Sequence, residues 1–203
     1  MQFVHRLLMV TGFLIGVLLA TSASRGEETS LQVGDPAPVF QCLDDQGRVW
    51  NSRDYIGKKM VIVYFYPSDF SFCCTRQAVR YRDRLRDFCN EGVEVVGISG
   101  DVVQAHRLFQ ATHKLNFTLL SDDDGSIASQ FGVPLRVGGK ASVADEFGHE
   151  IMDAQGKAIK VPRQVTAARW TFVINREGRV IYRDTEVSPV KDSQVVLDFL
   201  RKQ

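Results

Sequence analysis

The fold is decided by residues 59–100, which read KMVIVYFYPSDFSFCCTRQAVRYRDRLRDFCNEGVEVVGISG. Residues 60–66 form an unbroken apolar run rich in β-branched and aromatic side chains, which predicts a buried strand. Pro67 ends this strand, because proline cannot donate to a sheet ladder. A helical pattern opens at Cys73, and the apolar run 93–98 predicts the next strand. Strand, helix and strand within about forty residues make a βαβ unit, which builds parallel sheets.

The predicted helix has one apolar side and one polar side. The apolar residues recur at steps of three and four: Ala78, Tyr81, Leu85 and Phe88. The residues expected on the polar side are Gln77, Arg80 and Arg84. Cys74 is in phase with the apolar side and Cys73 with the polar side, so we expect Cys74 to point toward the sheet and Cys73 away from it.

Cys74 would also lie in the first turn of this helix. Unpaired N–H groups and the helix dipole favour an anion there, and such a setting favours the reactive thiolate over the neutral thiol. The simpler alternative is that Cys74 is a buried apolar residue. Its position alone leaves the two interpretations about even.

The surrounding residues favour the first interpretation. Pro67, Ser71 and Cys74 fit the pattern P-x-x-x-[T/S]-x-x-C, and C-T-x-[E/Q] follows at 74–77. With these motifs the chain resembles the peroxiredoxin family (alkyl hydroperoxide reductase and thiol-specific antioxidant proteins), most closely the branch of the bacterioferritin comigratory protein. The resemblance runs from about residue 33 to the C-terminus and includes GDPAPVF at 34–40 and RWTFVI at 169–174.

The resemblance implies an α/β, thioredoxin-like fold, in which helices flank a central mixed β-sheet. It implies a thiol-dependent peroxidase of the thioredoxin-dependent type, which reduces hydrogen peroxide and organic hydroperoxides through a cysteine sulfenic acid. It implies no cofactor and no metal. The partners would be the peroxide and a thiol reductant, either a thioredoxin-like protein or a small thiol. In this resemblance the catalytic residues are Cys74, Ser71, Arg169 and Pro67, and the supporting residues are Gln77 and Thr75.

Each catalytic residue has an expected role. Cys74 would attack the peroxide, and Ser71 would stand at the family's threonine. Pro67 would shield the thiolate, and Arg169 would be the active-site arginine. Arg169 can reach Cys74 only if the sheet brings the ends of two distant strands together. The alternative for Arg169 is a surface ion pair.

Three features depart from the family's pattern. Ser71 replaces threonine and lacks the methyl group that fixes the threonine rotamer. The dipeptide at 72–73 replaces the usual P-x before the cysteine. Val79 stands where many members of the branch carry a resolving cysteine.

Without a cysteine at that position, we expect the Cys74 sulfenic acid to be reduced by an outside thiol. Cys89 lies fifteen residues along the same helix, ~22 Å away at 1.5 Å per residue, whereas a disulfide needs Cα atoms within ~7 Å. Cys73 is adjacent, and a vicinal disulfide would be strained. The sequence does not reveal the distance from Cys74 to Cys42.

Length and composition favour one α/β domain at 31–203. Compared with the branch that it resembles, the chain carries an insertion at about 133–168. The chain has 203 residues, of which 44% are hydrophobic and 24% charged. The net charge of +1 gives no electrostatic case for nucleic acid or an anionic membrane surface. We expect the protein to be a monomer or homodimer. The four cysteines are irregularly spaced and do not suggest a disulfide framework.

The N-terminus has the pattern of a secretory signal. A basic start precedes an apolar run at 7–20 and small residues at 21–23. We expect residues 1–23 to be a signal peptide, 24–30 a flexible leader, and the protein to be exported to the periplasm or the extracellular space. An anchor formed by an uncleaved signal is the alternative, although the run is shorter than the ~20 residues that span a bilayer.

Several other segments carry definite expectations. Asp101 would cap a helix at 102–113, with His106 and His113 on its solvated face. Cys42 would be a small apolar filler in a strand at 39–43, and Cys89 a core residue. The insertion would carry its own hairpin or lid, with Gly156 turning a hairpin between 151 and 161. Residues 170–175 and 180–183 would form a hairpin, and 190–201 a closing helix.

Two other functions compete with the peroxidase. An exported thioredoxin-like thiol–disulfide oxidoreductase would need C-x-x-C, and the vicinal pair Cys73-Cys74 argues against it. A copper- or thiol-binding accessory module would need a Cys/His/Met cluster, for which His149 and Met152 are the only hint.

Overall fold

The computed structural model describes residues 30–203, so the predicted signal peptide at 1–23 lies outside the described residues. The helices are α1 (Phe72–Asn90), α2 (Val103–His113), α3 (Ser126–Gln130) and α4 (Asp192–Leu200). The strands are β1 (Gln41–Asp44), β2 (Val49–Asn51), β3 (Met60–Phe65), β4 (Val93–Ser99), β5 (Thr118–Ser121), β6 (Leu135–Ser142), β7 (Lys160–Ala167), β8 (Trp170–Ile174) and β9 (Val180–Asp184). None of these helices is long and apolar enough to cross a membrane.

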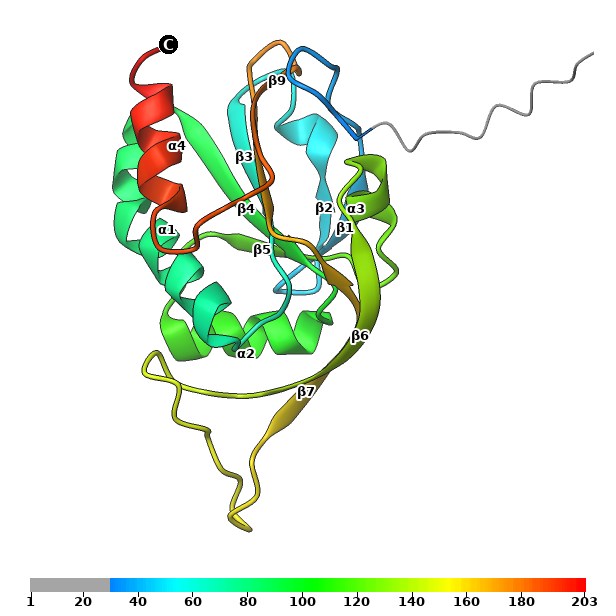
Figure 1. The fold of residues 1–203 in the computed structure, drawn as a ribbon, viewed down its shortest axis with the longest axis vertical. Coiled ribbons are helices and arrows are strands. Elements are labelled where there is room, and N and C mark those ends of the chain that lie inside the picture. The colour runs from blue at the N-terminus through cyan, green and yellow to red at the C-terminus, as the bar shows by residue number, and fades with distance from the viewer. Residues whose placement is uncertain (1–29) are drawn as a thin grey trace, which may run out of the picture.

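A mixed, seven-stranded sheet forms the centre of the molecule (Figure 1), with the order β2-β1-β5-β4-β3-β8-β9. Strand β4 pairs in parallel with β3 on one side and with β5 on the other, as the βαβ pattern predicted. Strand β8 joins β3 in antiparallel orientation, and β9 follows as a hairpin. The expected α/β, thioredoxin-like architecture is confirmed.

Both faces of this sheet are covered, which explains why β3 is apolar without alternation. One face carries Ile62 and Tyr64 of β3 and packs against α1, α2 and α4. The other face carries Val61, Val63 and Phe65 and packs against α3 and the N-terminal segment. In Figure 1, α1 and α4 lie side by side on one flank of the sheet.

The side chains of α1 follow the predicted periodicity with two exceptions. Cys74 is buried and Cys73 exposed, as expected. Gln77 was expected on the polar side but is fully buried, because α4 packs along α1 and covers a second stripe of it. Cys89 was expected in the core but is exposed. Phe88 occupies the core position of the last turn, and the next residue points roughly 100° further round the helix.

The predictions for α2 were wrong at both histidines and at the cap. His106 and His113 are buried, because the loop after β3 packs over the face of α2 that carries them. Val102 occupies the N-cap position. Asp101 instead lies buried at the end of β4, where its carboxylate accepts hydrogen bonds from Ser99 and from the backbone of Asp69.

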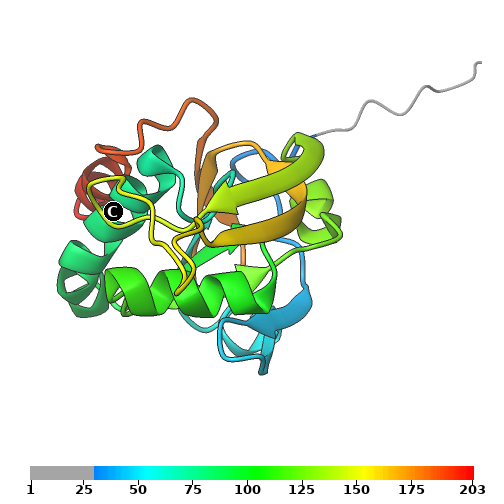
Figure 2. The ribbon, with the colours of Figure 1, turned by 90° about the horizontal axis from the view of Figure 1, so that it is seen from below.

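The insertion forms an arm of its own. Strands β6 and β7 pair over most of their length and extend from one end of the sheet, and the tip segment 143–159 lies beyond them (Figure 1). Gly156 turns the end of the tip with a positive φ of 74°, as predicted, but the long pairing is β6 with β7. Figure 2 views the arm from below, together with α2.

The arm is seated on the body near the end of β4. A Cβ atom added to Gly100 would lie 2.2 Å from the backbone oxygen of Val165 in β7. Only glycine permits that approach. At the far end of the arm, the tip residues Glu146 and Phe147 line a groove with Thr75 and Val79 of α1.

Candidate active site

The sheet brings Arg169 to the start of α1. Because β8 runs antiparallel to β3, Trp170 at the start of β8 lies opposite Phe65 at the end of β3. Arg169 directly precedes Trp170, so it emerges at the edge of the sheet where the chain leaves β3 for α1. Two segments that are far apart in the sequence therefore meet at Cys74.

Cys74 lies in the first turn of α1, and its side chain is only 1% exposed. Ser71 is the N-cap residue, and its hydroxyl accepts a hydrogen bond from the backbone N–H of Cys74 at 3.4 Å. The carbonyl of Ser71 accepts the first helical hydrogen bond, from Thr75 N–H, at 2.8 Å. The thiol thus lies at the positive end of the helix dipole, where backbone N–H groups face the side chain.

Arg169 contacts both Cys74 and Gln77. Its Nη2 donates to Cys74 Sγ at 3.1 Å, and its Nη1 donates to Gln77 Oε1. The guanidinium remains protonated in proteins, so it places a permanent positive charge beside the sulfur. The predicted meeting of Arg169, Ser71 and Cys74 is therefore present in the structure.

Behind Gln77 lies Asp192, a residue that the sequence analysis did not single out. Its Oδ2 accepts from Gln77 Nε2 at 2.6 Å, from the Tyr81 hydroxyl at 2.9 Å and from the Thr171 hydroxyl at 3.0 Å. Burial raises the pKa of Asp192, although these three hydrogen bonds act against the rise. Because Gln77 Nε2 donates to Asp192, the Oε1 atom of the same amide points toward Arg169.

Asp192 carries no motif that could have identified it. An aspartate in the first turn of a terminal helix is most simply a partner of the helix dipole. Its role depends on the packing of α4 against α1, which the sequence does not specify.

A cavity of about 440 Å³ adjoins this site. Pro67, Ser71 and Phe72 line it from the loop before α1, and Ser142 and Arg163 line it from the arm. Pro67 is half-buried at its wall, next to the N-cap that precedes the cysteine. The insertion thus helps to shape the approach to the end of α1 that carries Cys74.

Thr75 lies apart from this polar network. Its side chain is 2% exposed, and within residues 30–203 its hydroxyl has no hydrogen-bond partner. The structure therefore does not connect Thr75 to Cys74 through its side chain.

The remaining cysteines are separated from Cys74. All four cysteines are free. Cys42 is half-buried in β1 and packs in the cluster on the opposite face of the sheet from Cys74. Burial and the carboxylates of Asp122 and Asp44 raise the pKa of Cys42 to about 12, so it is a poor nucleophile. Cys89 is exposed in the last turn of α1.

The hint of a copper site gains no support from the geometry. His149 Nδ1 lies 3.0 Å from the carboxylate of Asp145 in the exposed tip of the arm, and Met152 is 52% exposed. Across residues 30–203, no group of three or more His, Cys, Asp or Glu side chains is placed to hold a metal ion.

Comparison with known proteins gives consistent similarities. The model of the AhpC/TSA family matches residues 33–183. A chloroplastic peroxiredoxin Q of Populus jackii is 42% identical over 170 residues, which cover 83% of this chain and 67% of that protein. The peroxiredoxin Q of Oryza sativa subsp. japonica is 42% identical over 149 residues, or 73% of this chain and 57% of that protein. The chain thus spans little more than half of the rice protein.

Solved structures share the same fold. Peroxidoxin BcpB of Mycobacterium tuberculosis superposes with a TM-score of 0.67 at 26% identity, covering 85% of this chain and 97% of that chain. The bacterioferritin comigratory protein of Xanthomonas campestris, described for its alkyl peroxide reduction activity, gives a TM-score of 0.65 at 23% identity, with coverages of 85% and 96%.

Proposed function

The chain belongs to the AhpC/TSA family, the peroxiredoxins, and from that premise we propose that it is a thiol-dependent peroxidase with Cys74 as the attacking residue. Its substrates are hydrogen peroxide and organic hydroperoxides. The observation that carries the assignment to Cys74 is the 3.1 Å contact between its buried sulfur and Arg169 Nη2 at a helix N-terminus.

The chemistry follows from this arrangement. The Cys74 thiolate attacks one peroxide oxygen, an S–O bond forms and the O–O bond breaks. The sulfur becomes a sulfenic acid, and the other oxygen leaves as hydroxide or alkoxide and takes up a proton to become water or an alcohol. Arg169 favours the thiolate and can donate to the peroxide oxygens, where negative charge develops. Ser71 holds the turn that aims the sulfur.

Stopped-flow reaction of the reduced protein with hydrogen peroxide and with an organic hydroperoxide tests this function. Rapid consumption that Cys74→Ser abolishes supports it. Insulin reduction and copper titration of the same protein test the two competing functions. The peroxidase assignment fails if the protein reacts with peroxide no faster than a free thiol does, or if insulin reduction is its faster reaction.

For the second half of the cycle we propose that an outside thiol reduces the Cys74 sulfenic acid. The positions of Cys42 across the sheet and of Cys89 at the far end of α1 support this proposal. The reductant is a thioredoxin-like protein or a small thiol. Mass analysis under non-reducing conditions, after one equivalent of peroxide and then thiol, should show a mixed disulfide at Cys74. An intramolecular disulfide that forms in high yield would contradict the proposal.

We also propose that the protein is exported and acts in the periplasm or outside the cell as a monomer or homodimer. The support for export is the signal-like pattern of residues 1–23 in the sequence. N-terminal sequencing of the protein from its native compartment should find a start just after Ala23. A start at Met1 in a membrane fraction would indicate an uncleaved anchor, and a start at Met1 in the cytosol would refute export. Light scattering of the purified protein measures the oligomeric state.

A further inference from the structure

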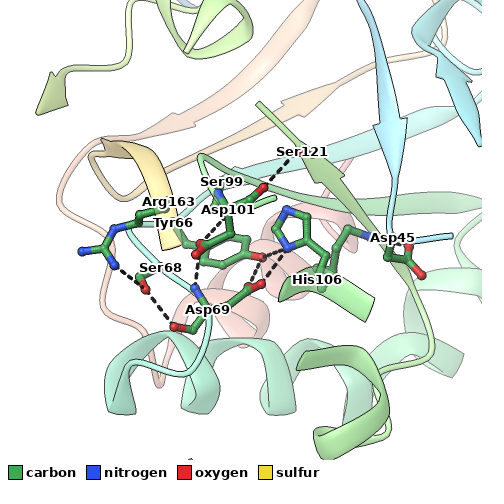
Figure 3. Close-up of polar contacts among 10 residues, drawn as sticks. Asp45, Tyr66, Ser68, Asp69, Ser99, Asp101, His106, Ser121 and Arg163 are labelled. Carbon is green, nitrogen blue, oxygen red and sulfur yellow. Dashed lines mark hydrogen bonds and ion pairs between the residues drawn. The ribbon is translucent and has the colours of Figure 1, made fainter. Parts of the chain in front are cut away.

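A second buried polar cluster lies beside the active site, on the loop between β3 and α1 (Figure 3). At its centre is Asp69, which is fully buried. Its Oδ1 accepts from the Tyr66 hydroxyl at 2.8 Å, and its Oδ2 accepts from His106 Nδ1 at 2.8 Å. A carboxylate can only accept hydrogen bonds, so Nδ1 of His106 carries a proton.

The backbone of Asp69 is held as firmly as its side chain. Its N–H donates to Asp101 Oδ2 at 2.8 Å, and its carbonyl accepts from the Ser68 hydroxyl at 2.7 Å. Asp101 is fixed in turn by the Ser99 hydroxyl, which donates to the same oxygen at 2.8 Å. This loop residue thus has two side-chain and two main-chain hydrogen bonds, to residues that follow β3 and β4, to α2 and within the loop.

Burial and the neighbouring charges act on the pKa of His106 in opposite directions. Burial alone would lower the pKa of His106, but the carboxylates of Asp69, Asp101 and Asp45 outweigh it and raise that pKa. Other titratable groups face the cluster from the surrounding elements: Tyr64 of β3, His113 of α2 and Arg163 of β7.

The residue after Asp69 shows why the loop needs such support. Phe70 has a φ of 59°, in the left-handed region that bulky residues avoid. Its ring is buried against Phe109 of α2, with ring centroids 5.0 Å apart. The next residue is Ser71, the N-cap of the helix that carries Cys74. An unfavourable backbone conformation thus lies between Asp69 and the cap, and it persists only when its surroundings hold it.

The arm is attached to the same loop. Arg163 Nη1 of β7 donates to the Ser68 hydroxyl at 3.1 Å, and its Nε donates to Thr166 at 2.9 Å. The loop before α1 is therefore held by Asp101, by His106 of α2 and by Arg163 of the inserted arm, which surround Ser68 and Asp69 in Figure 3.

We propose that Asp69, paired with His106, is a positioning residue for Cys74: it holds the strained turn at Phe70, so that Ser71 caps α1 and the sulfur lies beside Arg169. Asp69 does not contact the sulfur and acts through the backbone of residues 70–74. The inference rests on the proposed function, because it assigns Asp69 a part in the same reaction.

The test separates positioning from stability. In a Cys73→Ser/Cys89→Ser background, absorbance at 240 nm against pH reports ionisation of Cys74, because Cys42 titrates only at about pH 12. Asp69→Ala should move the midpoint of this titration upward by about one pH unit and lower the peroxide rate constant at pH 7 by about tenfold. Asp69→Asn retains the shape and can pair with neutral His106, so it should recover most of both quantities.

Asp122→Asn is the matched control. Asp122 is another buried carboxylate that accepts two hydrogen bonds. Its donors are the N–H groups of Ile127 and Ala128 in α3, which packs on the other face of the sheet. The variant Asp122→Asn should lower the melting temperature and leave the titration of Cys74 unchanged. If Asp69→Ala does not fold, His106→Gln tests the same pair and should give the same upward shift.

An unchanged titration midpoint and rate constant in folded Asp69→Ala, or in folded His106→Gln, would overturn the proposal and leave the cluster a purely structural role. Because the absorbance titration needs no peroxide, it remains readable even if the proposed peroxidase activity is wrong. Failure of the positioning role and failure of the function are therefore distinguishable.

Discussion

Arg169 Nη2 lies 3.1 Å from Cys74 Sγ, although 95 residues separate the two along the chain. The contact exists because β8 pairs antiparallel with β3, so that the residue before β8 emerges beside the loop that leads into α1. Arg169 and Cys74 are thus brought together by the neighbouring strands β3 and β8, while Gln77 and Asp192 fix the far side of the guanidinium.

The first prediction concerns the choice between two adjacent cysteines. Cys74→Ser should abolish peroxide consumption, and Cys73→Ser should retain a substantial part of it. Cys73 is the more exposed of the two but lies away from Arg169, and exposure without a charge partner does not activate a thiol. Peroxide consumption by the two single variants decides the matter. Equal losses in both, or full activity in Cys74→Ser, would show that the wrong sulfur has been chosen.

Arg169→Ala should slow the reaction with peroxide by about 100-fold, because it removes a donor aimed at the reacting atoms. Arg169→Lys retains the charge but not the planar fork that reaches both Cys74 and Gln77, so it should recover only part of the rate. Stopped-flow rate constants are compared with melting temperatures, which should change little. If Arg169→Ala mainly lowers the melting temperature, the role of Arg169 is structural.

Asp192→Ala should affect both stability and rate. It leaves three buried donors without their acceptor, at a cost of ~1–3 kcal/mol for each unsatisfied group. It also frees Gln77 to rotate, and the peroxide rate constant should fall about tenfold. Asp192→Asn retains an acceptor oxygen and should keep most of the rate. Urea unfolding and stopped-flow kinetics measure the two effects, and equal rate losses in both variants would contradict the role of Asp192 as a hydrogen-bond acceptor.

The buried cluster of Asp69, Asp101 and His106 makes stability depend on pH. Burial and Asp69 raise the pKa of Asp101 to about 6, so the free energy of unfolding should fall as the pH rises from about 4 to about 6. The pKa of His106 is raised above 6.5, so its contribution is fully present below that pH and is lost as the pH rises through the higher folded value.

Urea unfolding at a series of pH values measures both effects. Asp101→Asn should flatten the decline in the acidic window, and His106→Gln should flatten the one above pH 6.5. Profiles identical to that of the wild type would show that neither group titrates as described.

Gly100→Ala should disturb the seating of the arm. The added methyl group would lie 2.2 Å from the backbone oxygen of Val165, so β7 must move away from the end of β4. We expect a loss of ~1–3 kcal/mol in the free energy of unfolding and faster proteolysis of the arm. Gly139→Ala is the control for an added methyl group within the arm itself, where the nearest atom, Nη2 of Arg163, lies 3.7 Å from the added Cβ. Equal protease sensitivity in the two variants would argue against this contact.

Much of the fold followed from local patterns in the sequence. The unbroken apolar run of β3, the proline after it and the periodicity of α1 predicted the βαβ unit and the inward direction of Cys74. The motif from Pro67 to Cys74 located the turn that carries the proposed attacking residue, because spacing along one loop and one helix is a local property. The same holds for the hairpin of β8 and β9 and for the turn at Gly156.

What the sequence left open depends on which elements pack together. Gln77 was expected at the surface, and the docking of α4 buries it and supplies Asp192. His106 was expected in solvent, and the loop after β3 encloses it and supplies Asp69. The sequence pattern assigns the polar side of a single amphipathic helix to solvent. A second element that packs on that side buries its residues, and the pattern of one helix does not show whether such an element exists. The sequence by itself determined the strand, the turn and the inward direction of Cys74. Only the tertiary structure decided which distant charges meet there, because contacts between remote segments depend on strand pairing and helix docking rather than on local spacing.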